Sequence, residues 1–293
     1  MKDKLVDWAY GLGWAAVRAL PESTARRLFQ YGADRAYRRN DRGVQRLRSN
    51  LARIRPGDEA LVQAAMRSYA RYWREAFRLP TLSEKRTVAT FHVENEDILR
   101  AQAARGKGVV IALPHSGNWD HAGAWACALG FRLTTVAERL KPESLFQRFV
   151  AYRESLGMEI LPLTGGARPP LEVLAERLRS GGVVVLLADR DLSTRGVEVK
   201  FFGDRTKMAP GPAVLALRTG APLLTVDLWY ENESHARIRG PLPVPDESLS
   251  FGERVSTISQ HIADNFAEGI AAHPADWHML QRLWLDDLTV RRP

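Results

Sequence analysis

The chain has 293 residues, of which 45% are hydrophobic, and its 42 lysines and arginines outnumber 34 acidic residues to give a formal net charge of +8. That length and apolar content allow one large buried core, and the basic surplus indicates an anionic partner such as nucleic acid, an anionic bilayer or a polyphosphate ligand. The single cysteine, Cys127, excludes an internal disulfide and a thiolate cage for a metal, and its apolar neighbours predict a small buried hydrophobe rather than a nucleophile.

The first 80 residues predict a set of helices. Apolar residues recur at helical spacing through residues 1–20, Pro21 precedes a second helix, and a Pro-Gly-Asp turn precedes a third helix over residues 58–79. Arginine is abundant here, with tyrosine and tryptophan interleaved, and no repeat or low-complexity tract is present. We expect residues 1–80 to form a helical, membrane-associating region.

The N-terminal helix over residues 1–20 admits two interpretations. Trp8, Tyr10 and Trp14 beside basic residues fit a helix that lies on anionic lipid, and the same aromatics fit a helix packed on the core. Acidic residues interrupt the apolar stretch, so we do not interpret it as a signal peptide, and no run of about 18 apolar residues is present to span a membrane. We therefore expect a peripheral protein on the cytoplasmic face of the plasma membrane.

The remainder of the chain alternates between strands and helices. Short apolar runs predict buried strands over residues 108–113, 133–137, 158–163, 183–188 and 222–230. Helices are predicted over residues 119–129, 142–156, 170–179, 211–219 and 251–271. This order predicts an α/β core over residues 81–293, with a mostly parallel central sheet flanked by helices, forming one integrated domain with its N-terminal helical extension. In such a sheet the ligand site lies beyond the carboxyl ends of the strands.

The segment His115-Ser-Gly-Asn-Trp-Asp120 carries the strongest chemical signal. A predicted strand ends at Pro114, so His115 stands at its carboxyl end, and a tight turn leads into the next helix. A spacing of five residues does not match one helix face, but it fits a turn in which Asp120 folds back to the imidazole. The pair predicts a general base oriented by a carboxylate, with the acceptor's own hydroxyl as the nucleophile.

The turn after His115 also supplies candidates for substrate binding. Backbone N–H groups of residues 117–119, at a helix start, are expected to stabilise a thioester oxyanion, and Asn118 and Trp119 are counted with the substrate-binding residues. The alternative interpretation is structural: a capping aspartate and a histidine without a catalytic role.

A charged cluster, Asp189-Arg190-Asp191, follows the strand over residues 183–188, on the same sheet edge as His115. We expect Asp189 to be a third catalytic residue that faces the histidine or the acceptor, and Arg190 or Lys207 to meet a phosphate. A solvated loop with a salt bridge is the alternative interpretation of this cluster.

Glu138 follows the strand over residues 133–137, and Arg153 lies on the next predicted helix. Both are candidates for binding polar or anionic head groups at the rim of the sheet. The other histidines lack the spacing of metal ligands; His273 and His278 bracket a tryptophan without a third ligand, so we predict no catalytic metal.

The segment from His115 to Asp120 matches the histidine–four residues–aspartate motif of the glycerolipid acyltransferases. The chain most resembles the branch that contains the lipid A late acyltransferases and, within it, the phosphatidylinositol mannoside acyltransferases. The likeness extends over nearly the whole chain and includes blocks at residues 66–80, 188–192, 197–203, 219–222 and 276–281.

This resemblance implies an acyl-CoA such as palmitoyl-CoA as donor substrate, with no further cofactor. It implies that the acceptor is the 6-hydroxyl of the mannose at inositol position 2 of a phosphatidylinositol mannoside, at an anionic membrane surface. Glu138 and Arg153 resemble groove-lining residues of the mannoside enzymes. Where related glycerol-phosphate enzymes have a glutamate, this chain has the shorter Asp189, which leaves its role less secure.

Three alternatives stay open. In the first alternative, the enzyme acylates the hydroxyl of a lipid A-type or glycerolipid acceptor. In the second alternative, the same histidine activates water and the protein is a hydrolase. The third is a nucleic-acid-binding protein, motivated by the charge of +8 and the interleaved arginines and aromatics. Because no zinc finger, aromatic RNA-binding signature or helix-turn-helix pattern accompanies them, we expect no nucleic-acid partner.

Overall fold

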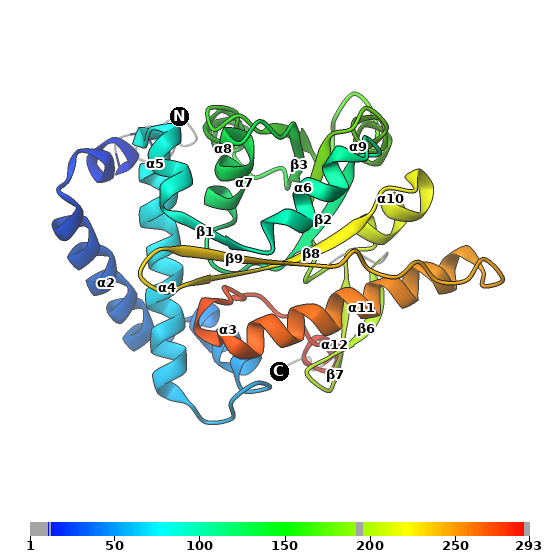
Figure 1. The fold of residues 1–293 in the computed structure, drawn as a ribbon. Helices are drawn as coiled ribbons and strands as arrows, with labels where there is room; N and C mark the ends of the chain where they lie inside the picture. The colour runs from blue at the N-terminus through cyan, green and yellow to red at the C-terminus, as the bar shows by residue number, and fades with distance from the viewer. Residues whose placement is uncertain (1–10, 12, 192–195, 290–293) are drawn as a thin grey trace.

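The computed structural model describes residues 11, 13–191 and 196–289, which form an α/β fold around a seven-stranded sheet (Figure 1). In spatial order its strands are β1 (Phe91–Glu94), β9 (Ser234–Arg239), β8 (Leu223–Tyr230), β2 (Val109–Leu113), β5 (Val183–Leu187), β3 (Leu133–Ala137) and β4 (Glu159–Pro162). Every neighbouring pair is parallel except β8 and β9, which run antiparallel. The mostly parallel α/β sheet predicted from the sequence is confirmed.

Helices flank the sheet and extend from its N-terminal side. They are α2 (Glu22–Arg39), α3 (Arg42–Leu51), α4 (Glu59–Arg78), α5 (Glu84–Ala89), α6 (Glu96–Ala104), α7 (Trp119–Ala128), α8 (Glu143–Glu154), α9 (Pro170–Arg179), α10 (Gly211–Thr219), α11 (Phe251–Ala272) and α12 (Leu285–Thr289), with short 3-10 turns η1 (Leu79–Thr81) and η2 (Pro274–Asp276). In Figure 1, α2 and α4 lie side by side, next to the turn that joins β8 to β9.

Several elements were absent from the sequence prediction: β1, β9, the hairpin of β6 (Val197–Phe201) and β7 (Asp204–Met208), and the short helices α3, α5 and α6. The prediction relied on continuous apolar runs, which mark strands that are buried on both faces. β1 and β9 instead alternate buried and accessible residues, so they lack such a run.

Side chains of each central strand divide between two apolar clusters, one on each face of the sheet. Val110 and Ala112 of β2 enter the cluster that includes residues of α9, α10 and α11, whereas Ile111 and Leu113 enter the cluster that includes residues of α6, α7 and α8. This alternation is the two-residue period of a strand. Helix α3 joins the first cluster through Leu47 and Leu51, so the N-terminal helices share the core of the sheet.

Trp14 serves packing. It is 7% exposed, its ring lies 4.9 Å from Phe77 and 5.2 Å from Tyr152, and its indole N–H donates to the Phe77 carbonyl over 3.0 Å. For this residue the second interpretation of the N-terminal helix holds. Trp8 and Tyr10 lie outside the described residues. Within the described part of the chain, no helix combines the length and apolar character needed to cross a bilayer.

Candidate active site

His115 lies just beyond the carboxyl end of β2, on a loop that is fixed by the neighbouring strand β8. Gly117 has a φ of 53°, and a Cβ atom there would lie 2.9 Å from the backbone of Leu228, so a side chain has no room. The Gly117 N–H donates to the Asp276 carbonyl over 2.9 Å, and the His278 N–H donates to the His115 carbonyl over 2.8 Å. These contacts hold the loop in place over the carboxyl end of the sheet.

The carboxylate that binds the His115 ring belongs to Asp189, two residues beyond Leu187, at which the adjacent strand β5 ends. Asp189 Oδ1 lies 2.6 Å from His115 Nδ1, and Asp189 Oδ2 accepts the His115 backbone N–H and the Trp277 indole N–H, both over 3.0 Å. Burial alone would raise the pKa of Asp189, but the charge of His115 and these donors outweigh it and hold that pKa below its ordinary value.

An ionised Asp189 fixes the tautomer of the histidine. Its Oδ1 accepts the Nδ1–H, which leaves Nε2 with a lone pair that can accept a proton. Asp189 is fully buried, whereas the His115 side chain is 20% exposed, so the ring reaches accessible space while its partner does not. A histidine held in this way has the geometry that a general base with an orienting carboxylate requires.

The expectation that Asp120 holds the His115 ring is wrong. Asp120 Oδ1 accepts a hydrogen bond from Arg153 Nε over 2.7 Å, and Oδ2 accepts one from the Tyr72 hydroxyl over 2.8 Å. Asp120 is the second residue of α7, and its carboxylate binds side chains of α4 and α8. Asp189, in contrast, follows the strand next to β2 and so reaches the histidine directly.

The remaining candidates differ in their surroundings. Asn118 caps α7 by accepting the His121 N–H over 3.0 Å, and its amide donates to Glu75 over 3.2 Å. Trp119 stacks on Tyr72 at 4.0 Å and meets the edge of the His115 ring at 5.6 Å. Because the Gly117 N–H is already bonded, only the backbone N–H groups of Asn118 and Trp119 remain from the expected oxyanion donors.

Glu138 and Arg190 are not brought into contact with the His115 ring. Glu138 is exposed, directly after β3. Arg190 follows Asp189, and its buried Nη1 has no hydrogen-bond partner among the residues that the structure describes. Cys127, expected to be buried, is half-buried against the apolar cluster on the α7 side of the sheet, and this burial raises the pKa of its thiol to about 11.

Sequence reasoning missed His278, whose backbone lies against His115. The hydroxyl of Ser68 donates to Asp276 Oδ1 over 2.5 Å, and His278 Nε2 lies 3.0 Å from the same hydroxyl. Burial, with a contribution from the charge of His115, lowers the pKa of His278 to about 3, so its ring is neutral. A signal was available in the sequence, because residues 276–281 form one of the blocks that carry the resemblance.

An apolar cavity lies beside the site, between the sheet and α7. Leu113 and Trp119, which flank the His115 loop, line it together with Ile111, Ala122 and Ala126. Its volume is about 50 Å³, which is room for a water or two. A long hydrocarbon chain would enter only if side chains along this cavity move apart.

Comparison with known proteins agrees with the resemblance. A family model described as bacterial lipid A biosynthesis acyltransferase matches residues 1–286. A relative from Mycobacterium tuberculosis, named phosphatidylinositol mannoside acyltransferase, is 52% identical over 293 residues that cover 98% of this chain and 90% of the relative. A relative of the same name from Mycolicibacterium smegmatis is 49% identical over 294 residues, with 99% and 94% covered. The chain therefore belongs to the bacterial lipid A biosynthesis acyltransferase family.

Proposed function

We propose that this protein transfers a long-chain acyl group, such as palmitoyl, from acyl-CoA to the 6-hydroxyl of a mannose on phosphatidylinositol mannoside. Two relatives that share about half of its residues carry the name phosphatidylinositol mannoside acyltransferase. The single observation that carries the chemistry is the 2.6 Å contact between His115 Nδ1 and the buried Asp189, at the carboxyl edge of the sheet.

In the proposed reaction, His115 Nε2 removes the proton from the mannose hydroxyl as its oxygen attacks the thioester carbonyl. The new C–O bond forms, the C–S bond breaks, and the imidazolium returns its proton to the departing CoA thiolate. Asp189 stabilises the imidazolium without taking the proton. The N–H groups of Asn118 and Trp119, at the positive end of α7, stabilise the oxyanion.

Asp120 acts through its partners in this proposal. By binding Arg153 and Tyr72, it fixes a guanidinium near the transfer centre, and Arg153 then acts with Glu138 and Arg190 on the polar part of the substrates. The acyl chain of the donor occupies the apolar cavity between the sheet and α7, which widens to receive it.

The same proposal places the protein on the anionic, cytoplasmic surface of the plasma membrane. Helix α2 exposes Leu28 and Tyr31, 53% and 60% accessible, at helical spacing with the exposed Arg27, Arg35 and Arg38. Apolar side chains flanked by arginines on one helix face bind anionic lipid surfaces.

The test is incubation with labelled palmitoyl-CoA and separate acceptors: a phosphatidylinositol mannoside, a lipid A precursor and a lysoglycerolipid. We expect acylation of the mannoside, at the 6-hydroxyl by fragmentation of the product, and none with folded His115→Ala. Preferred acylation of another acceptor would refute the mannoside, and release of free fatty acid alone would favour a hydrolase. Equal transfer by wild type and His115→Ala would refute the mechanism.

A further inference from the structure

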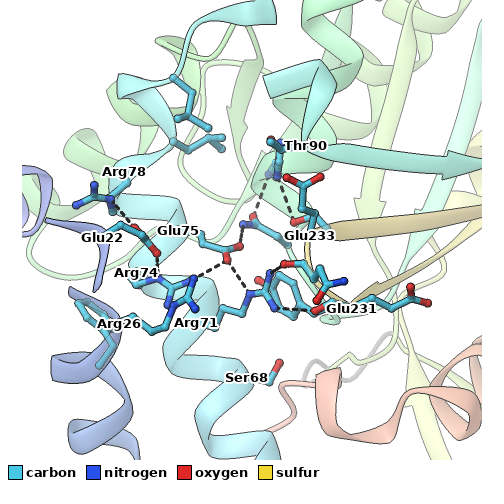
Figure 2. A pocket seen from close by; sticks show the side chains of 18 of the residues that line it. Glu22, Arg26, Ser68, Arg71, Arg74, Glu75, Arg78, Thr90, Glu231 and Glu233 are labelled. Atoms are coloured by element: carbon cyan, nitrogen blue, oxygen red, sulfur yellow. Dashed lines mark hydrogen bonds and ion pairs between the residues drawn. The ribbon is translucent and has the colours of Figure 1, made fainter. Parts of the chain in front are cut away.

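A second, larger cavity of about 710 Å³ opens between helices α2 and α4 and the turn that joins β8 to β9 (Figure 2). Among the described side chains that line it are Asn118 and Asp276, but not His115, Asp120 or Asp189. Asn118 reaches its wall through Glu75, to which it donates over 3.2 Å. The cavity is therefore a neighbour of the transfer centre that shares Asn118 with it, and its other lining side chains are different.

Arginine dominates the wall of this cavity. Six arginines line it: Arg26, Arg67, Arg71, Arg74, Arg78 and Arg86. Three of them share only two carboxylates, since Glu22 pairs with both Arg74 and Arg78, and Glu75 pairs with both Arg71 and Arg74. Figure 2 shows these five side chains converging on the cavity from α2 and α4.

The side-chain carboxylates of the other acidic residues of the wall are bound to groups other than its arginines. Glu233 pairs with His92 over 2.8 Å, and Glu231 lies near the indole of Trp229. Asp276 accepts from Ser68 and from the Tyr230 backbone N–H. Arg67 pairs with Asp34, which lies outside the wall, over 2.7 Å. The six guanidinium groups thus have three carboxylate partners between them, and within the described part of the chain Arg26 and Arg86 have no ion pair.

Two buried donors in the wall form no hydrogen bond to any residue that the structure describes. Arg74 is 6% exposed, and its Nε–H, although 3.3 Å from a Glu22 oxygen, finds no hydrogen bond within the described part of the chain. The same is true of the buried Tyr230 hydroxyl, whose ring lies 4.0 Å beneath the guanidinium of Arg71. A buried donor without an acceptor is costly, so an oxygen of a ligand in this space would gain a hydrogen bond from each of these two groups.

We infer that this cavity binds a phosphate ester. Phosphate supplies only acceptor oxygens and negative charge, which is what unpaired N–H and O–H donors beside surplus guanidinium groups require. A sugar or polyol alone would supply no anion for Arg26 and Arg86, which have no ion pair among the described residues. The volume of about 710 Å³ exceeds that of a phosphate and leaves room for the group to which it is esterified.

The proposed function suggests two sources of such a phosphate. One is the phosphodiester headgroup of an inositol lipid, and the other is the phosphorylated end of coenzyme A. Only this choice of probes depends on the proposed function; the inference of a phosphate site does not. The probes are glycerophosphoinositol, coenzyme A and inorganic phosphate, titrated by calorimetry at low salt into the full chain. No acyl transfer is needed, so failure of the proposed reaction leaves this result intact.

The variants are Arg74→Gln, Tyr230→Phe, and the double variant Arg26→Gln/Arg86→Gln. The last changes two exposed side chains and keeps the test decisive if Arg74→Gln does not fold. Arg168→Gln, which removes an exposed arginine paired with Glu176 before α9, is the charge-matched control.

We expect the wild type to bind inorganic phosphate weakly and one of the two organic probes more tightly. Each arginine variant should raise the dissociation constant of that probe by about tenfold or more, and Tyr230→Phe should raise it by a smaller factor. Arg168→Gln should leave it unchanged. The organic probe that responds identifies the source. No binding of any probe, or affinities that the cavity variants leave unchanged or that the control weakens equally, would overturn the inference.

Discussion

Arg153 donates to Asp120 over 2.7 Å, and both side chains are largely buried, so the aspartate of the histidine–aspartate motif is engaged by an arginine of α8. The motif thus contains two residues with different surroundings. His115 is oriented by a carboxylate from a distant block, Asp189, whereas Asp120 joins α7 to α4 and α8. Substitutions at the two aspartates should therefore have different effects.

Asp189→Asn keeps the shape of the side chain but removes the charge that fixes the His115 tautomer. We expect kcat to fall by about 10²- to 10⁴-fold with KM nearly unchanged, because the loss affects proton transfer rather than binding. Steady-state kinetics with the acceptor and donor of the proposed reaction measure this. Asp246→Asn, on an exposed loop, is the control, and a loss confined to KM would contradict the role of Asp189.

Asp120→Asn should act first on stability. It leaves Arg153 buried without its anionic partner, a change that costs about 3–5 kcal/mol in comparable buried pairs. Urea unfolding measures this loss, and Arg153→Gln in the same chain should restore part of it, because the unpaired charge is then gone. Independent, additive losses in the double variant would show that the two side chains are not coupled.

The sequence predicted the central strands and several helices closely, and the reason is burial. The bounds predicted for α9 and α10 are those of the structure, and the runs that form β2, β3, β5 and β8 are apolar because both faces of these strands are covered. The edge strand β1 and its neighbour β9 alternate buried with accessible positions and carry charged residues, so neither shows the continuous apolar run of the central strands.

For the site, strand order decided what the sequence could indicate. Residues placed at the carboxyl ends of parallel strands were expected at one edge, and His115 and Asp189 meet there because β2 and β5 are neighbours. The orientation of the Asp120 side chain depends on the angle at which α7 leaves the preceding turn. The spacing of residues in the sequence does not determine that angle. The approach of His278 depends on the course of the chain after α11, so no local pattern placed it beside His115.

The depressed pKa of His278 predicts a pH-dependent stability. The ordinary pKa is 6.5 and burial lowers it to about 3 in the folded protein, so between these values the unfolded chain binds a proton that the folded protein does not. Stability from this group is therefore complete above about pH 6.5 and declines as pH falls toward about 3, by about 3 kcal/mol at about pH 4.5.

His278→Gln should flatten this part of the profile, because glutamine does not titrate. Urea unfolding of both proteins at about pH 7 and about pH 4.5 gives the comparison. Asp189 loses its contribution at lower pH, because its carboxylate protonates below the ordinary value of 3.8. Parallel profiles for the two proteins across this range would show that His278 does not carry the effect.

The apolar cavity predicts control of donor length by residues of α7. Ala122 and Ala126 of α7 line it together with Ile111 and Leu113. In the proposed reaction, the acyl chain extends from the thioester into the space beside the alanine methyl groups. Ala126→Leu fills part of that space. The specificity constant for palmitoyl-CoA should therefore fall by about tenfold or more relative to that for a shorter donor. The reason is that each methylene excluded from the cavity loses about 0.8 kcal/mol of burial free energy. The ratio of kcat/KM values for long and short acyl-CoA donors measures this shift.

Ala101→Leu, on the exposed face of α6, adds the same side chain outside the cavity and should leave the ratio unchanged. A ratio that both variants leave unchanged would place the acyl chain elsewhere, since filling its path must discriminate against the longer donor.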